Sequence, residues 1–113
     1  MQDEIEIKTI SVDEAKQRLD QQSAVFLDVR DPGSYQTAHI PGAILVNDDN
    51  LNEIIGTADK SQTHILYCYH GVSSQGGAAY FQEMGFKDVY SMDRGFSGWH
   101  HQFDSVLEQK NSI

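Results

Sequence analysis

Short apolar segments alternate along the chain with longer stretches in which apolar residues recur every three or four positions. Ala24–Val29 is a nearly continuous apolar run, which is typical of a central strand that is covered on both faces. The patterns elsewhere predict strands at 5–8, 43–46, 64–67 and 88–90, and helices near 12–21, 35–38, 51–55, 74–84 and 96–103. Strands that alternate with helices imply a parallel sheet, so we expect an α/β fold with about five strands and helices on both faces.

Several helix boundaries are marked by residues that satisfy free backbone groups. Ser11 and Glu14 are typical of a capping box, in which each side chain accepts a hydrogen bond from the other residue's backbone amide. We further expect Ser34 to cap the short helix through Ala38, Ser73 or Ser74 to cap the helix after Cys68, and Gly56 and Gly85 to end two helices.

Three chemically active stretches lie at the carboxyl ends of predicted strands. They are Asp28-Val29-Arg30, the segment from Cys68 to Ser74, and Asp93-Arg94-Gly95. In open parallel sheets the ligand site lies beyond the carboxyl ends of the strands. We therefore expect these stretches to meet at one edge of the sheet and to form the functional site.

The length of 113 residues suits one domain with a single core. We expect that domain to occupy 1–113, with its core at about 9–103 and a tail at 108–113 that frays. No apolar run approaches the roughly 18 residues that span a bilayer. The acidic start Met1–Glu4 also lacks the basic and then apolar pattern of a secretory signal, so we expect a cytoplasmic protein.

The formal net charge of −9 limits the possible partners. Nucleic acids and anionic membranes bind basic surfaces, so we expect neither as a partner. The histidines show no spacing typical of a zinc site, and no cofactor motif is visible, so we expect no metal and no cofactor. An anionic substrate would have to be attracted locally, against the overall charge of the protein.

Cys68 is the only cysteine, and it is therefore either an inert core residue or a reactive thiol. It lies between a strand and a helix, where amide groups and the helix dipole lower the pKa of a thiol. Gly71 allows the loop to turn its amides inward, and Ser73 and Ser74 add hydroxyl donors. This context favours a nucleophile that can hold an anion. His70 needs no role as a base, since amide dipoles already favour the thiolate.

The loop Cys68-Tyr69-His70-Gly71-Val72-Ser73-Ser74 resembles the active-site loop of the rhodanese family. The flanking motifs occur in the family's order: Asp28-Val29-Arg30 and His39-Ile40-Pro41-Gly42-Ala43 before the loop, and Gly95-Phe96-Ser97-Gly98-Trp99 after it. The chain most resembles the single-domain bacterial thiosulfate sulfurtransferases of the glycerol-3-phosphate regulon. The resemblance extends from about Thr9 to Phe103 and implies a single rhodanese-like domain.

The resemblance implies a transfer of sulfur in two steps. Cys68 attacks the outer sulfur of thiosulfate, releases sulfite and keeps a persulfide, which the loop from Tyr69 to Ser74 holds. An acceptor, either cyanide or a dithiol protein of the thioredoxin type, then removes the sulfur. Arg30 and Arg94 are candidates for attracting the anion, with Asp28 as the partner of Arg30. The alternatives are a purely structural ion pair for Asp28 and Arg30, and a solvated surface residue for Arg94.

Two other functions remain open at this point. Cysteine phosphatases and arsenate reductases bind their oxyanion with an arginine six positions after the cysteine, but Ser74 occupies that position here. The loop also has the short form, Cys68 to Ser73, that the resemblance links to sulfur. The second alternative is a relay module that accepts a persulfide from a partner and turns thiosulfate over poorly. The absence of Lys and Arg from the loop favours this module.

Overall fold

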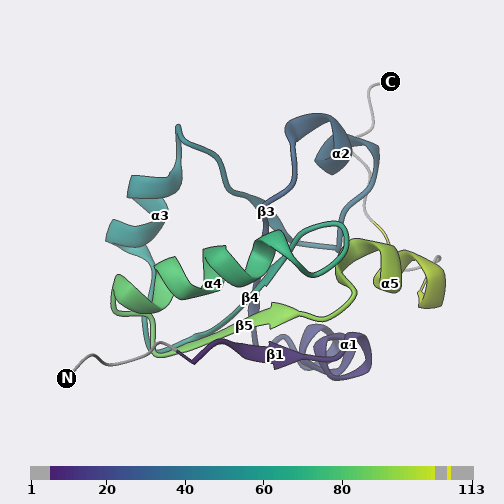
Figure 1. Ribbon diagram of the computed structural model, residues 1–113, viewed down its shortest axis with the longest axis horizontal. Coiled ribbons are helices and arrows are strands. Elements are labelled where there is room, and N and C mark those ends of the chain that lie inside the picture. Colours follow the sequence, from purple (N-terminus) through teal and green to yellow (C-terminus); the bar gives the residue numbers. More distant parts are fainter. Residues whose placement is uncertain (1–5, 104–106, 108–113) are drawn as a thin grey trace.

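Five parallel strands form the central sheet of the computed structural model, which describes residues 6–103 and 107 (Figure 1). The strands are β1 (Lys8–Ile10), β2 (Val25–Asp28), β3 (Ile44–Leu45), β4 (Thr63–Tyr67) and β5 (Asp88–Met92), and their order in the sheet is β1-β5-β4-β2-β3. The helices are α1 (Val12–Gln21), α2 (Pro32–Thr37), α3 (Leu51–Thr57), α4 (Ser73–Glu83) and α5 (Gly95–Gln102). The predicted α/β fold with a parallel sheet is confirmed.

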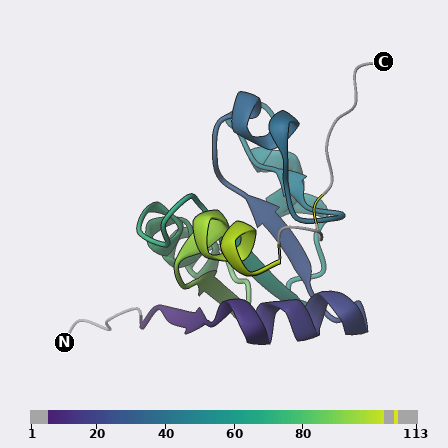
Figure 2. The ribbon, with the colours of Figure 1, turned by 90° about the vertical axis from the view of Figure 1, so that its right-hand side faces the viewer.

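The helices cover both faces of the sheet, as Figures 1 and 2 show from two directions. One hydrophobic core lies between the sheet and the helices α1 and α5, and a second lies between the sheet and the helices α3 and α4. The central strand β4 is buried at every position because it contacts both cores. This explains why the sequence of a central strand shows continuous apolar character rather than alternation.

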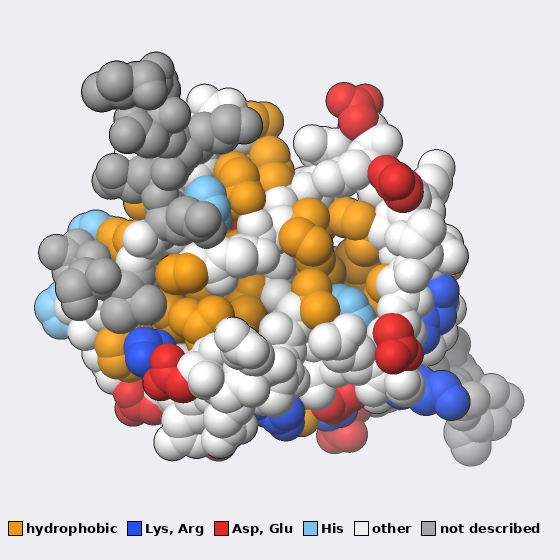
Figure 3. All heavy atoms as spheres, turned by 180° about the vertical axis from the view of Figure 1, so that it is seen from behind, with side chains coloured by type: hydrophobic (Ala, Val, Ile, Leu, Met, Phe, Trp, Pro, Cys, Tyr) orange, Lys and Arg blue, Asp and Glu red, His pale blue; other side chains and the backbone are white. Residues whose placement is uncertain are grey.

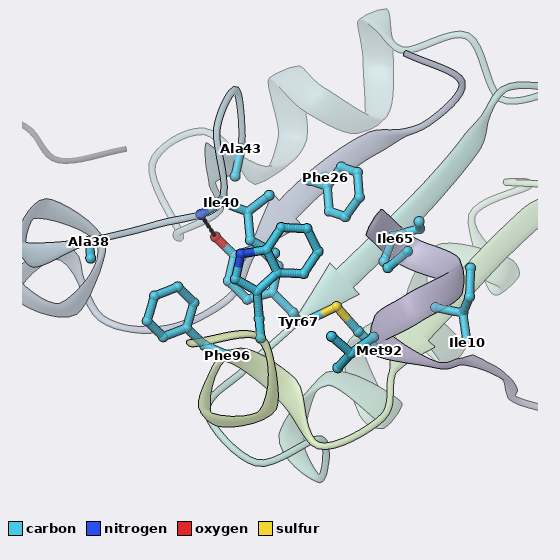
Figure 4. Close-up of a cluster of buried hydrophobic side chains, with 12 residues drawn as sticks. Ile10, Phe26, Ala38, Ile40, Ala43, Ile65, Tyr67, Met92 and Phe96 are labelled. Atoms are coloured by element: carbon cyan, nitrogen blue, oxygen red, sulfur yellow. Dashed lines mark hydrogen bonds between the residues drawn. The ribbon is translucent and has the colours of Figure 1, made fainter. Parts of the chain in front are cut away.

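The first core surrounds Trp99 of α5, whose side chain is fully buried. Phe96 and Phe103 pack in the same cluster, which confirms the apolar stripe expected on this helix. Tyr67 reaches into this core from β4, and its hydroxyl accepts a hydrogen bond from the Ile40 amide at 3.1 Å (Figure 4). This bond attaches the segment between α2 and β3 to the central strand, beside the end of β4 from which the cysteine loop starts.

Two predicted helix boundaries are confirmed in detail. Ser11 and Glu14 form the capping box of α1, with each side chain bound to the other residue's amide. Gly85 follows α4 with φ of 98°, and its amide donates to the Gln82 carbonyl while the Phe86 amide donates to the Phe81 carbonyl. This pair of bonds is a Schellman motif, which explains why a glycine is found there.

Other boundaries differ from the predictions. Asp31, not Ser34, caps α2, because Pro32 starts the helix one turn earlier and the Asp31 carboxylate accepts from the Ser34 amide. Gly56 lies within the last turn of α3 and does not end it. The strand predicted at 5–8 instead begins at Lys8, where pairing with β5 starts. The tail predicted at 108–113 lies outside the described residues.

Seen from behind, the molecule exposes hydrophobic side chains in the middle of the face, while charged side chains lie toward its margins (Figure 3). None of the helices in the described ranges is long and apolar enough to cross a membrane.

Candidate active site

Cys68 lies at the carboxyl end of β4, and the loop that it begins leads into α4 (Figure 1). Its side chain is buried, with 6% of the residue exposed. The sulfur accepts hydrogen bonds from the backbone amides of Gly71 at 3.2 Å and Ser74 at 3.3 Å, and the Ser74 Oγ lies 3.4 Å away. Polar groups of the loop and of the first turn of α4 therefore converge on one sulfur atom.

These groups lower the pKa of the Cys68 thiol from its ordinary value. Burial on its own raises that pKa, because a thiolate loses hydration inside the protein. The hydroxyl and amide of Ser74, together with the amides of Gly71 and His70, outweigh the effect of burial. The site thus favours the nucleophilic thiolate without a neighbouring base.

The sulfur also takes the place of a helix cap. Ser73 and Ser74 are the first two residues of α4 and not its cap, so the predicted serine cap is wrong. Val72 occupies the cap position and offers no side-chain acceptor. The amide of Ser74, which a cap side chain normally satisfies, donates to the Cys68 sulfur instead. A thiolate here also lies at the positive end of the α4 dipole.

Two glycines allow the loop to contact the start of α5 closely. Gly71 has φ of 86°, and a Cβ atom there would lie 2.8 Å from the Arg94 amide nitrogen. Gly95 has φ of 55°, and its Cβ would lie 2.5 Å from the Cys68 carbonyl oxygen. That carbonyl accepts a hydrogen bond from the Phe96 amide at 2.7 Å. Backbone contacts that only glycine permits therefore fix the position of the loop.

A second serine, which the sequence pattern does not single out, lies below the loop. The Ser91 Oγ lies 2.7 Å from the Ser74 Oγ, and both residues are buried. Each hydroxyl has one proton, so when Ser74 donates to the Cys68 sulfur, Ser91 must donate to Ser74. One signal in the sequence could have pointed to Ser91. It lies two residues after Val89 on β5, and therefore on the same buried face of the strand, where an apolar residue is usual.

Asp28, the last residue of β2, forms a buried ion pair with Arg30. The Arg30 Nη2 lies 2.7 Å from Asp28 Oδ2 and also donates to the Ala38 carbonyl at 2.7 Å. Burial lowers the pKa of Arg30, but the hydrogen bonds and charge of Asp28 outweigh it, so the pKa is raised overall. The guanidinium carbon lies 4.0 Å from the Phe96 ring centroid and 4.9 Å from that of Tyr69. Arg30 thus contacts three segments around the loop, through Ala38, Tyr69 and Phe96.

Tyr69, His70 and Val72 of the loop are exposed, while the Gly71 and Ser74 amides donate to the sulfur. Tyr69 is 44% exposed and Val72 is 72% exposed, so an apolar surface flanks the buried cysteine. His70 and Arg94 are exposed and line one hollow together, which places the Arg94 charge beside the loop. Arg94 also has left-handed φ of 64° at the start of α5.

A groove of about 700 Å³ adjoins the loop between α2 and α5. We call it the histidine groove, because three of the side chains that line it are histidines. Its lining consists of Arg30, Ser34, Thr37, Ala38, Tyr69, His70, Phe96, Ser97, His100 and His101. In the sequence, His100 and His101 show no spacing typical of a zinc site, and no role is predicted for them. These two histidines lie beside the loop because of how α5 packs, and this packing cannot be predicted from their positions in the sequence.

Both the sequence and the fold of the chain match known proteins. Residues 11–102 match the model of the rhodanese-like domain. The chain is 45% identical over 93 residues to thiosulfate sulfurtransferase GlpE of Shewanella oneidensis, covering 82% of this chain and 92% of that one. It is 42% identical to GlpE of Pseudoalteromonas translucida over 102 residues, covering 90% and 97%. The fold matches the crystal structure of a rhodanese-like domain protein from Staphylococcus aureus with a TM-score of 0.78 and 26% identity, covering 93% of this chain and all (100%) of that one.

Proposed function

Because the chain belongs to the rhodanese-like domain family, we propose that it is a thiosulfate sulfurtransferase that carries sulfur as a persulfide on Cys68. One observation carries the proposal: the Cys68 sulfur accepts hydrogen bonds from the amides of Gly71 and Ser74 at the start of a helix. These donors suit a sulfur anion both before and after it gains a second sulfur atom.

In the first step, the Cys68 thiolate attacks the outer sulfur of thiosulfate. A bond forms between the two sulfur atoms, the sulfur–sulfur bond of thiosulfate breaks, and sulfite leaves with the electron pair. The product is a persulfide that carries one negative charge on its outer sulfur. The lowered pKa of Cys68 raises the fraction of thiolate at a given pH, and the thiolate attacks without a proton transfer in this step.

In the second step, a nucleophile attacks the outer sulfur and Cys68 leaves as a thiolate. Cyanide gives thiocyanate directly. A dithiol takes the sulfur on one thiolate, and its second thiolate then displaces hydrosulfide and closes a disulfide. The same amides that stabilise the thiolate before the reaction stabilise it as the leaving group, because a thiol of low pKa leaves faster.

The loop offers little to a phosphoryl or arsenyl group. Enzymes that act on such groups use an arginine side chain to bind two of the oxygens. The corresponding position is Ser74, whose buried hydroxyl lies beside the sulfur and has no charge. Arg30 is already paired with Asp28, and Arg94 lies outside the loop on the exposed surface. Sulfur transfer is therefore the better match to this site.

The test is the production of thiocyanate from thiosulfate and cyanide, measured as the ferric complex. The wild-type protein should turn over, while Cys68→Ala and the near-isosteric Cys68→Ser should not. Turnover that survives either substitution would overturn the proposed role of Cys68. A protein that passes sulfur from a loaded persulfide to cyanide, yet loads poorly from thiosulfate, would instead be a relay module. Hydrolysis of an aryl phosphate would revive the phosphatase alternative.

A further inference from the structure

The histidine groove is larger than the sulfur donor requires. Its volume of about 700 Å³ falls within the range of roughly 300–1,000 Å³ that is usual for ligand sites, whereas thiosulfate contains only a few atoms. Cys68 does not line the groove, but Tyr69 and His70, the next two residues, do. The groove therefore adjoins the position of the persulfide without enclosing it. This arrangement suits a part of the acceptor that lies beside its reacting thiol.

The groove differs in charge from the rest of the protein. The chain has 17 acidic and 8 basic residues, yet none of the described side chains that line the groove is Asp or Glu. A neighbouring hollow of about 380 Å³ shares His70 and His101 with the groove and adds Arg94, again with no acidic lining residue in the described part of the chain. Donor groups and basic side chains are thus concentrated beside the catalytic loop.

We propose that the histidine groove binds an acidic segment of the protein that accepts the sulfur, next to that protein's dithiol. The proposal rests on the proposed function, since it names the kind of acceptor that the persulfide meets. Carboxylates of such a segment would contact His100 and His101 on α5, while the apolar surface of Tyr69 and Val72 covers the region around the dithiol. Complementary charge of this kind raises association rates and selects partners.

The ion pair with Asp28 offsets the charge of Arg30, so the exposed histidines of the groove and Arg94 in the neighbouring hollow make the docking contacts. Three exposed carboxylates lie near the groove without lining it. They are Asp31 at the start of α2, Asp93 before Arg94, and Asp13 of α1, which accepts a hydrogen bond from Gln102 of α5. The titratable groups of the two hollows are Arg30, Tyr69, His70, Arg94, His100 and His101.

The test compares two peptide acceptors that carry the same Cys-Gly-Gly-Cys dithiol. One peptide continues with four glutamates and the other with four glutamines. The protein is first loaded with thiosulfate, and the rate of sulfur transfer to each peptide is then followed by mass spectrometry at pH 6 and low ionic strength. We expect the glutamate peptide to react about fivefold faster than the glutamine peptide.

The double substitution His100→Gln/His101→Gln should bring this ratio close to one. Lys87→Gln, a control at the opposite end of the sheet, should leave the ratio unchanged. Transfer to dithiothreitol should be equal in all three proteins. Because the ratio is compared between proteins, intrinsic differences in reactivity between the peptides cancel.

A ratio that the histidine substitutions do not change would overturn the docking proposal. Failure of the proposed function has a different signature, because the wild-type protein would then gain no sulfur in the loading step.

Discussion

Ser74→Ala removes the hydroxyl that lies 3.4 Å from the Cys68 sulfur and leaves both backbone donors in place. Hydrogen bonds to charged groups contribute about 1.5–3 kcal/mol. Sulfur is a weak acceptor and the contact is long, so we take the lower value of about 1.5 kcal/mol. Since 1.36 kcal/mol corresponds to one pH unit, the pKa of the Cys68 thiol should rise by about one.

The assay is the rate of Cys68 alkylation by iodoacetamide across a range of pH, with the product identified by mass. The chain has one cysteine, so the modified site is unambiguous. An unchanged pKa in Ser74→Ala would refute the assignment of the hydroxyl as a donor to the thiolate. It would leave the backbone amides as the only groups that lower this pKa.

Ser91 provides a check on the same reasoning. Ser74→Ala leaves the buried Ser91 hydroxyl without its partner at 2.7 Å, which should lower the free energy of unfolding by about 1–3 kcal/mol. The double substitution Ser74→Ala/Ser91→Ala removes both hydroxyls and should recover part of that stability while the thiol pKa stays raised. If stability and thiol pKa instead return together, the two effects share one cause and the separate roles of the two hydroxyls are wrong.

Three further predictions concern the residues around the loop. Asp28→Asn removes the charge that pairs with buried Arg30 and should lower the free energy of unfolding by about 3–5 kcal/mol in urea titrations; a loss below about 1 kcal/mol would contradict a buried pair. Gly95→Ala should abolish thiocyanate production, because its Cβ would lie 2.5 Å from the Cys68 carbonyl oxygen, whereas Gly56→Ala, in open space on a helix, should keep activity and add up to about 1 kcal/mol of stability. Because the pKa of the Cys68 thiol is lower in the folded state, its thiolate contributes stability above the unfolded value of about 8.5, and this contribution is lost as the pH falls through the folded pKa. The urea midpoint should show this loss in the wild-type protein and lack it in Cys68→Ala.

The sequence was sufficient for features that depend on local pattern. The apolar runs located all five strands, although the first was placed too early, and the spacing of Ser11 and Glu14 located the start of α1. The strand, cysteine and helix in succession also placed Cys68 at the carboxyl end of the central strand. Each of these features is a property of neighbouring residues, so no tertiary contact is needed to recognise it.

The features that the sequence does not reveal depend on contacts between distant segments. Ser91 meets Ser74 only because β5 lies beneath the start of α4. The serines after Cys68 were expected to cap α4, but the folded loop brings the cysteine sulfur to that position first. The histidine groove forms where α2 and α5 lie close together, and the spacing of residues along the chain does not predict this contact.

The most direct test of sulfur transfer through Cys68 is the intact mass of the protein after incubation with thiosulfate and removal of the excess. Cys68 should gain the mass of one sulfur atom and lose it on addition of cyanide, with thiocyanate released in equal amount. Cys68→Ser, which keeps the size of the side chain and removes the thiol, should gain nothing. A wild-type protein whose mass does not change, or a Cys68→Ser protein that gains the sulfur, would contradict the claim that Cys68 carries it.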